Sequence, residues 1–303
     1  MTSSATESTM MRFFRKIGME SIAWSLRRLY VPVHKDALVL EVGSGGNPYC
    51  RANVLLDAYE STHERHWVPL VADRPTVLGF VEHLPFKNGA FDFVIASHVL
   101  EHSSNPERFL YELQRVARAG YIEVPDAFME RINPYKFHRL EITLREDKLI
   151  IRKKSSWIVE HDTVELYENK VKPFLTAELI PKHPFAFHVR YYWENNIDFI
   201  VVNPGVDAAW EAKLDDRQYV PEIKNLRGRI SGLLLRLLRS WLSQNSRNKK
   251  IDLRSLLICP GCGSDTLSSI PAGILCNKCG INYPIRRGIP VMIPDGLSKC
   301  VSQ

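Results

Sequence analysis

Short apolar runs alternate with helical stretches along the first two thirds of the chain. Five runs have the length and apolar content of buried strands: 38–42, 53–57, 76–80, 91–97 and 120–125. Residues 11–30 repeat apolar positions at helical spacing, and residues 105–118 begin with a capping Asn105 followed by Pro106. Strands that alternate with helices predict an α/β fold with a doubly wound, mostly parallel sheet.

Two further runs, 187–193 and 197–202, are joined by Glu-Asn-Asn and predict a closing antiparallel hairpin, which gives seven strands. Residues 126–185 precede this hairpin and are too long for a plain loop. We expect this insertion to contain a small hairpin of residues 140–143 and 149–152. We also expect the insertion to cover the active site and to choose the substrate.

A glycine-rich turn follows the first run, in Glu41-Val-Gly-Ser-Gly-Gly46. Such a turn lets the backbone approach a ligand closely. Glu41 ends the first run, and Asp57 ends the second run 16 residues later, where an acid can accept hydrogen bonds from ribose hydroxyls. The full dinucleotide fingerprint is absent, because its third glycine is missing and Pro48 follows at once.

The succession of these motifs resembles the class I S-adenosylmethionine-dependent methyltransferases. The likeness covers roughly residues 20–205 and includes Leu84-Pro-Phe, Phe91-Asp-Phe-Val and Leu100-Glu-His. It implies a seven-stranded Rossmann-like sheet with S-adenosylmethionine as cofactor. The cofactor contacts that it implies are Glu41, Gly43, Ser44, Gly45, Asn47, Asp57, Glu82 and Ser97.

The chain departs from this family in two places. Phe80 stands where an acid usually precedes Glu82 near the adenine. Only seven residues separate Gly46 from Val54, so the first helix of the fold must be short or absent.

Candidate catalytic residues follow the fourth strand, at the carboxyl end where open α/β sheets bind ligands. His98 is a candidate base or substrate contact, and His138 in the insertion is a second candidate, with a solvated histidine as the alternative. Glu101 and His102 are expected to cap and orient the following loop. Ala96-Ser-His-Val replaces the Asn/Asp-Pro-Pro-Tyr of enzymes that methylate amide or adenine nitrogens, so that chemistry is disfavoured.

Residues 98–102 also spell the His-x-x-Glu-His pattern of a zinc peptidase family. That site requires a helix that presents both histidines to one metal. Here the pattern directly follows a predicted strand, so we reject the peptidase interpretation.

Four of the six cysteines form two Cys-x-x-Cys pairs, separated by thirteen residues. This spacing indicates a structural zinc site with the ligands Cys259, Cys262, Cys276 and Cys279. Residues 252–297, with Tyr283-Pro-Ile-Arg-Arg-Gly-Ile-Pro-Val-Met292, are similar to the small zinc-ribbon activator subunit of tRNA, rRNA and release-factor methyltransferases. The resemblance implies that this ribbon docks within the chain, with residues 285–293 covering the edge strand 76–80.

Charge is unevenly distributed along the chain. The net charge is +6, and residues 222–254 alone hold nine Lys/Arg against two acids. A helix expected at 226–242 carries a basic and an apolar face. It is a packed linker helix, an interfacial membrane helix or a nucleic-acid contact. No secretory signal or spanning segment is evident, which predicts a cytoplasmic protein, with peripheral contact at the inner face of the membrane as an added option.

Together these patterns predict four regions: a disordered basic arm at 1–19, a catalytic domain at 20–210, a basic linker at 222–250 and a zinc ribbon at 252–297. The leading hypothesis is methyl transfer to an unidentified small, lipid-linked or glycan-linked hydroxyl. One alternative is an RNA or protein methyltransferase with a fused ribbon. Another is a cofactor-binding scaffold without activity.

Overall fold

The computed structural model describes residues 6–62, 67–132, 134–157, 170–210 and 242–294. Its largest sheet has six strands in the order β3-β2-β1-β4-β5-β8. Their bounds are β1 Val39–Val42, β2 Val54–Asp57, β3 Thr76–Leu78, β4 Phe93–Ser97, β5 Ala119–Pro125 and β8 His188–Glu194. β1 pairs in parallel with β2, and β2 with β3, whereas β5 and β8 are antiparallel. The predicted doubly wound, mostly parallel sheet is confirmed, and β3 lies at one of its two edges.

The chain forms two compact units. One contains residues 1–33, 96–110 and 119–214, and the other contains residues 34–95, 111–118 and 215–303. The helices are short: α1 Thr9–Lys16, α2 Glu20–Leu26, η2 Arg27–Leu29, η4 Val81–His83, η5 Leu100–His102, α3 Pro106–Val116, α4 Ala127–Ile132, α6 Lys172–Phe174, η7 Leu175–Leu179, α7 Ile180–Lys182, α8 Pro184–Phe187, α10 Asn245–Asn248 and α11 Leu253–Leu256.

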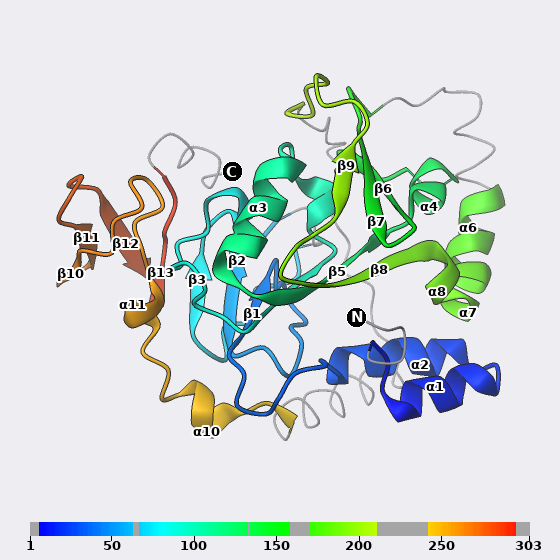
Figure 1. The fold of residues 1–303 in the computed structure, drawn as a ribbon, viewed down its shortest axis with the longest axis horizontal. Coiled ribbons are helices and arrows are strands. Elements are labelled where there is room, and N and C mark those ends of the chain that lie inside the picture. Colours follow the sequence, from blue (N-terminus) through cyan, green and yellow to red (C-terminus); the bar gives the residue numbers. More distant parts are fainter. Residues whose placement is uncertain (1–5, 63–66, 133, 158–169, 211–241, 295–303) are drawn as a thin grey trace. The chain divides into compact units, whose positions relative to one another are not determined.

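The predicted closing hairpin is wrong. β9 (Phe199–Val201) does not pair with β8 but runs parallel to β7 (Lys148–Lys153), which itself pairs with β6 (Leu140–Arg145) (Figure 1). The predicted small hairpin of β6 and β7 is therefore present. β9, which was predicted to join the main sheet, pairs instead with the free edge of β7. Because β9 leaves, the main sheet has six strands instead of seven.

Local signals set the other boundaries. The single helix predicted for residues 11–30 is divided into α1 and α2, and Gly18 between them has a φ of +77°. As predicted, Asn105 caps α3, where its Oδ1 accepts the backbone N–H of Arg108 at 3.0 Å. No helix is present among residues 43–53, which confirms the short connection between β1 and β2.

The C-terminal ribbon is a four-stranded sheet in the order β10-β11-β12-β13. Its strands are β10 Leu267–Ile270, β11 Gly273–Cys276, β12 Asn282–Arg286 and β13 Ile289–Pro290. Directly after β13, the N–H of Met292 donates to the carbonyl of Leu78 at 2.7 Å, and Val291 and Leu78 form a parallel bridge (Figure 1). The ribbon therefore covers the edge strand β3, as expected, through residues 291 and 292.

Packing and a second backbone contact reinforce this docking. Leu78, Val291 and Ile293 form a buried apolar cluster, against which Phe80 packs. A β-carbon at Gly79 would lie only 3.2 Å from the carbonyl oxygen of Met292, so the close approach favours glycine there. Before the first strand of the ribbon, the N–H of Ile258 donates to the carbonyl of Pro85 at 2.9 Å.

No helix among the described residues is long and apolar enough to cross a membrane. The basic helix expected at 226–242 lies outside the described residues except for its last position, Leu242.

Candidate functional site

The glycine turn after β1 is held in place by the two predicted acids. Gly43 and Gly45 have positive φ values of 63° and 56°. The N–H of Gly45 donates to Asp57 Oδ2 at 2.9 Å, and the N–H of Tyr49 donates to Glu41 Oε2 at 2.7 Å. Glu41 and Asp57 are both buried, and each carboxylate holds the backbone of the turn through its hydrogen bond to an N–H group.

Two further features describe the surroundings of this turn. Ser44 Oγ is buried and has no hydrogen-bond partner in the described part of the chain, so a polar ligand group would satisfy it. A β-carbon at Gly46 would lie 2.4 Å from Val68 Cγ1, and the N–H of Val71 donates to the carbonyl of Gly45 at 3.0 Å. The segment after β2 thus lies against the turn, a contact that the sequence did not reveal.

The remaining predicted cofactor contacts have different surroundings. Asn47 is exposed, whereas Glu82 is half-buried and lies on the short helix η4. Phe80, which replaces the expected acid, meets Tyr59 edge-on with ring centroids 6.0 Å apart. Ser97 belongs to the other unit, where its hydroxyl donates to Glu123 Oε1 at 3.0 Å.

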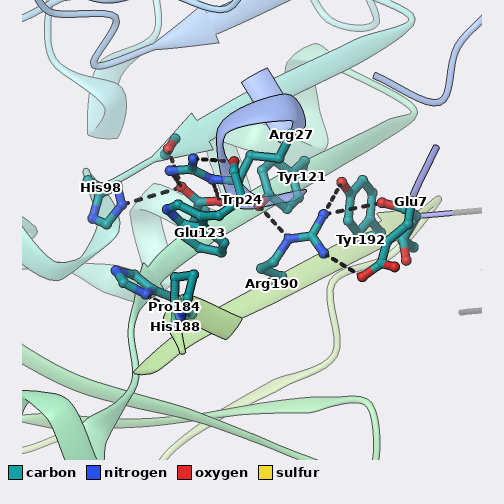
Figure 2. Close-up of polar contacts among 12 residues, drawn as sticks. Glu7, Trp24, Arg27, His98, Tyr121, Glu123, Pro184, His188, Arg190 and Tyr192 are labelled. Carbon is teal, nitrogen blue, oxygen red and sulfur yellow. Dashed lines mark hydrogen bonds and ion pairs between the residues drawn. The ribbon is translucent and has the colours of Figure 1, made fainter. Parts of the chain in front are cut away.

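His98 lies at the end of β4 with its imidazole between two buried carboxylates. Its backbone has a φ of +57°, and its N–H donates to the carbonyl of Glu123 at 2.7 Å. Nε2 lies 3.3 Å from Glu123 Oε1 (Figure 2). On the other side of the ring, Nδ1 lies 3.4 Å from Glu101 Oε1. The strained backbone and the two carboxylates hold this ring in one orientation.

Glu123 is the centre of the polar network around His98. It is fully buried in β5 and accepts hydrogen bonds from Arg27 Nε at 2.8 Å and Arg27 Nη2 at 3.0 Å (Figure 2). Burial opposes the charge of Glu123, but His98 and Arg27 hold the pKa of its carboxyl well below the usual range. Burial likewise opposes a charge on His98, but Glu101 and Glu123 raise its pKa to about 9. Action of His98 as a base therefore requires that it first release a firmly held proton.

The network extends to the N-terminal segment. Arg190 Nε donates to the hydroxyl of Tyr121, which in turn donates to Glu123. The same guanidinium contacts Tyr192 and Glu7 (Figure 2). Residues before β1 thus contribute to the surroundings of Glu123.

Sequence reasoning missed Glu123 and Arg27. A signal for Glu123 was available, because it is a lone acid inside the apolar run Tyr121-Ile-Glu-Val124. Lys, Glu, Arg and Asp are rarely buried unless paired. The partner could not be read from the sequence, since Arg27 is 96 residues away.

His138 is buried, so the expectation of a solvated histidine is wrong. Its Nδ1 lies 2.7 Å from Glu130 Oε2, and its ring meets that of His102 edge-on at 4.8 Å. The structure rejects the peptidase arrangement as expected, because His98 directly follows strand β4 and η5 provides only one turn after it.

The four C-terminal cysteines gather at one point. Their sulfur atoms all lie within 4.8 Å of one another, and the pairs Cys259–Cys279 and Cys262–Cys276 are 3.6 Å apart. Tetrahedral zinc with Zn–S bonds of about 2.3 Å places sulfur atoms about 3.8 Å apart, a spacing close to that of the two 3.6 Å pairs. Both knuckles turn alike: the N–H of Gly263 donates to the carbonyl of Cys259, and that of Gly280 to the carbonyl of Cys276. The cluster is therefore compatible with zinc.

Comparison with known proteins adds independent information. The family model described as a methyltransferase domain matches residues 40–122. No curated protein matches the chain.

Solved structures align weakly. A chain from the complex between the Haloferax volcanii Trm112 methyltransferase activator and a methyltransferase is 17% identical, with a TM-score of 0.31, over 43% of this chain and 74% of that one. A SAM-dependent methyltransferase from Aquifex aeolicus is 18% identical, with a TM-score of 0.27, over 39% and 73%. These alignments identify neither an acceptor nor a partner of this protein. The family match to residues 40–122, which run from β1 into β5 of this sheet, supports a methyltransferase domain in this part of the chain, with S-adenosylmethionine as the expected cofactor.

Proposed function

We propose that this protein transfers the methyl group of S-adenosylmethionine to a hydroxyl group of a small, lipid-linked or glycan-linked acceptor. The observation that carries this proposal is the imidazole of His98, oriented by Glu123 at the carboxyl end of β4. Ligands of open α/β sheets bind at the carboxyl ends of the strands.

The cofactor supplies an electrophilic methyl group on its sulfonium. Asp57 would hold the ribose, Glu41 the amino-acid end, and Ser44 a polar group above the turn. Glu82 and the backbone of Gly43 and Gly45 would complete the contacts. The main task of these residues is to align the reactants and to exclude water.

A hydroxyl acceptor loses its proton as it receives the methyl group, which is where a base contributes. Glu123 orients the imidazole through Nε2, as a carboxylate does in catalytic triads. Nδ1 faces Glu101 Oε1 at 3.4 Å, so an acceptor hydroxyl would approach Nδ1 of the neutral ring beside that carboxylate and transfer its proton there. The surrounding carboxylates then stabilise the imidazolium that forms. His138 would contribute to the acceptor side only indirectly.

The four cysteines would hold a structural zinc ion, with no coordination position left open. Zinc would fold the ribbon, and the folded ribbon would cover β3 as an internal subunit. The sequence of residues 226–242 combines basic and apolar positions that suit a membrane surface, and this pattern supports a lipid-linked acceptor.

Two alternatives have specific support. An RNA or protein acceptor is favoured by the ribbon and by the excess of Lys/Arg in residues 222–254. A scaffold without activity is favoured by Phe80, which packs against Tyr59 and the ribbon cluster where an adenine contact was expected.

Incubation of the full chain with methyl-labelled cofactor and a cell extract, later separated into lipid, small-molecule, RNA and protein fractions, distinguishes these functions. We expect label in the lipid or small-molecule fraction. His98→Gln should lower the rate about 10²- to 10⁴-fold, the usual contribution of a base. The control His34→Gln changes a histidine that is 75% exposed and should leave the rate unchanged. Label in RNA or protein, or full activity of His98→Gln, would contradict the proposal.

A further inference from the structure

We propose that Glu101, His102 and His138 bind a divalent transition-metal ion, distinct from the ion expected at the four cysteines. One ligand atom of each residue lies within 4.8 Å of the others. All three belong to the same compact unit, so the grouping is a property of one part of the fold.

Glu101 provides the first argument. Its carboxylate is 2% exposed, and neither oxygen has a hydrogen-bond partner in the described part of the chain. Its ion-pair contact with His98 Nδ1 is long, at 3.4 Å. Burial opposes the charge on this carboxylate, but the nearby His98, His102 and His138 offset that cost and lower its pKa to about 2. A metal ion would supply the direct contact that both oxygens lack in the described part of the chain.

The surroundings of His138 provide the second argument. Its Nδ1–H donates to Glu130 Oε2 at 2.7 Å, which leaves Nε2 as the available ligand atom. Glu130 is itself fixed by Lys154 Nζ at 2.7 Å and by the N–H of Tyr135 at 3.2 Å. Metal-binding histidines almost always donate their other N–H in this way, to a carboxylate or a carbonyl.

The segments that carry the ligands are joined by a backbone hydrogen bond. The N–H of Arg139, next to His138, donates to the carbonyl of Glu101 at 2.7 Å. The ring of Tyr135 stacks on that of His138 at 4.7 Å, and the ring of His102 meets it edge-on. The positions of the three side chains are thus set by the protein before any ion arrives.

Two imidazoles and one carboxylate form a donor set used for zinc and for non-haem iron, with coordination positions left for water or another oxygen ligand. This set differs from the peptidase pattern in the sequence, because His98 is not a member and faces Glu123. It also differs from the cysteine cluster, which has no open position.

Zinc content measures the proposal directly. Full-length protein, first stripped with a chelator and then equilibrated with excess Zn²⁺, should hold about two zinc ions per chain after desalting. Glu101→Gln and His138→Asn should each hold about one. The amide introduced by His138→Asn can still donate to Glu130, which limits disruption of the fold. The control His34→Asn should hold two.

A second measurement uses the unmutated chain, so it does not depend on how the variants fold. Protein loaded with one equivalent of Zn²⁺ should bind about one equivalent of Co²⁺ with d–d absorption and without thiolate charge-transfer bands. A single zinc ion in the parent chain with no Co²⁺ uptake would overturn the proposal. Two zinc ions retained in both variants would also overturn it.

Discussion

Replacement of Cys276 by serine is expected to unfold the C-terminal ribbon and to leave the chain insoluble or unable to bind its cofactor. The cysteine sulfur atoms form a closed four-ligand set, and metal binding in such small domains is worth about 10–16 kcal/mol of folding free energy. Loss of the ribbon would expose β3, the edge of the main sheet, along with the apolar side chain of Leu78. An exposed apolar edge strand promotes aggregation.

The experiment compares zinc content, solubility and size by gel filtration for Cys276→Ser and for the control Cys50→Ser. Cys50 is a thiol outside the ribbon, and its replacement should be tolerated far better. Val291→Asp separates docking from metal binding, because it places a charge in the apolar cluster on β3 and leaves all four cysteines intact. This variant should keep its zinc and still aggregate. A Cys276→Ser protein that is soluble, monomeric and binds cofactor normally would show that the ribbon is an independent module.

Replacement of Arg27 by alanine is expected to lower the free energy of unfolding by about 3–5 kcal/mol. The variant leaves the carboxylate of Glu123 at 0% exposure without its bidentate partner. Burial destabilises the charged carboxylate of Glu123, and the remaining contacts to His98, Ser97 and Tyr121 offset that destabilisation only in part. Urea unfolding followed by circular dichroism measures the loss.

Arg118→Ala is the matched control, because it breaks an ion pair with Asp92 in which the arginine side chain is 75% exposed. Exposed pairs contribute about 0–1 kcal/mol. Equal stabilities of the Arg27 and Arg118 variants would mean that Glu123 does not depend on Arg27.

Local sequence patterns were sufficient for the strands of the main sheet, the glycine turn and the two cysteine knuckles. Each depends on residues close together in the chain, such as the apolar run before Gly43 or the pair Cys259 and Cys262. The docking of the ribbon followed from the resemblance to the activator subunit, which implied that residues 285–293 cover the edge strand; the observed bridge joins Val291 to Leu78.

The features that were missed depend on contacts distant in the sequence. β9 has the composition of a strand in any sheet, and its choice of β7 depends on an edge that only the folded insertion provides. The same holds for the ion pair between Arg27 and Glu123. Glu101 and His138 are 37 positions apart, so no local pattern groups them.

Calorimetric titration of the full chain with S-adenosylmethionine tests directly whether the turn after β1 holds the cofactor, since it needs no acceptor. We expect one binding site per chain. Asp57→Ala should bind about 10- to 100-fold more weakly, which corresponds to the loss of a charge-assisted hydrogen bond worth about 1.5–3 kcal/mol. Asp36→Ala, which removes an acid that is 72% exposed, should bind like the parent. Absence of binding by the parent, or equal affinity of the parent and Asp57→Ala, would contradict this assignment.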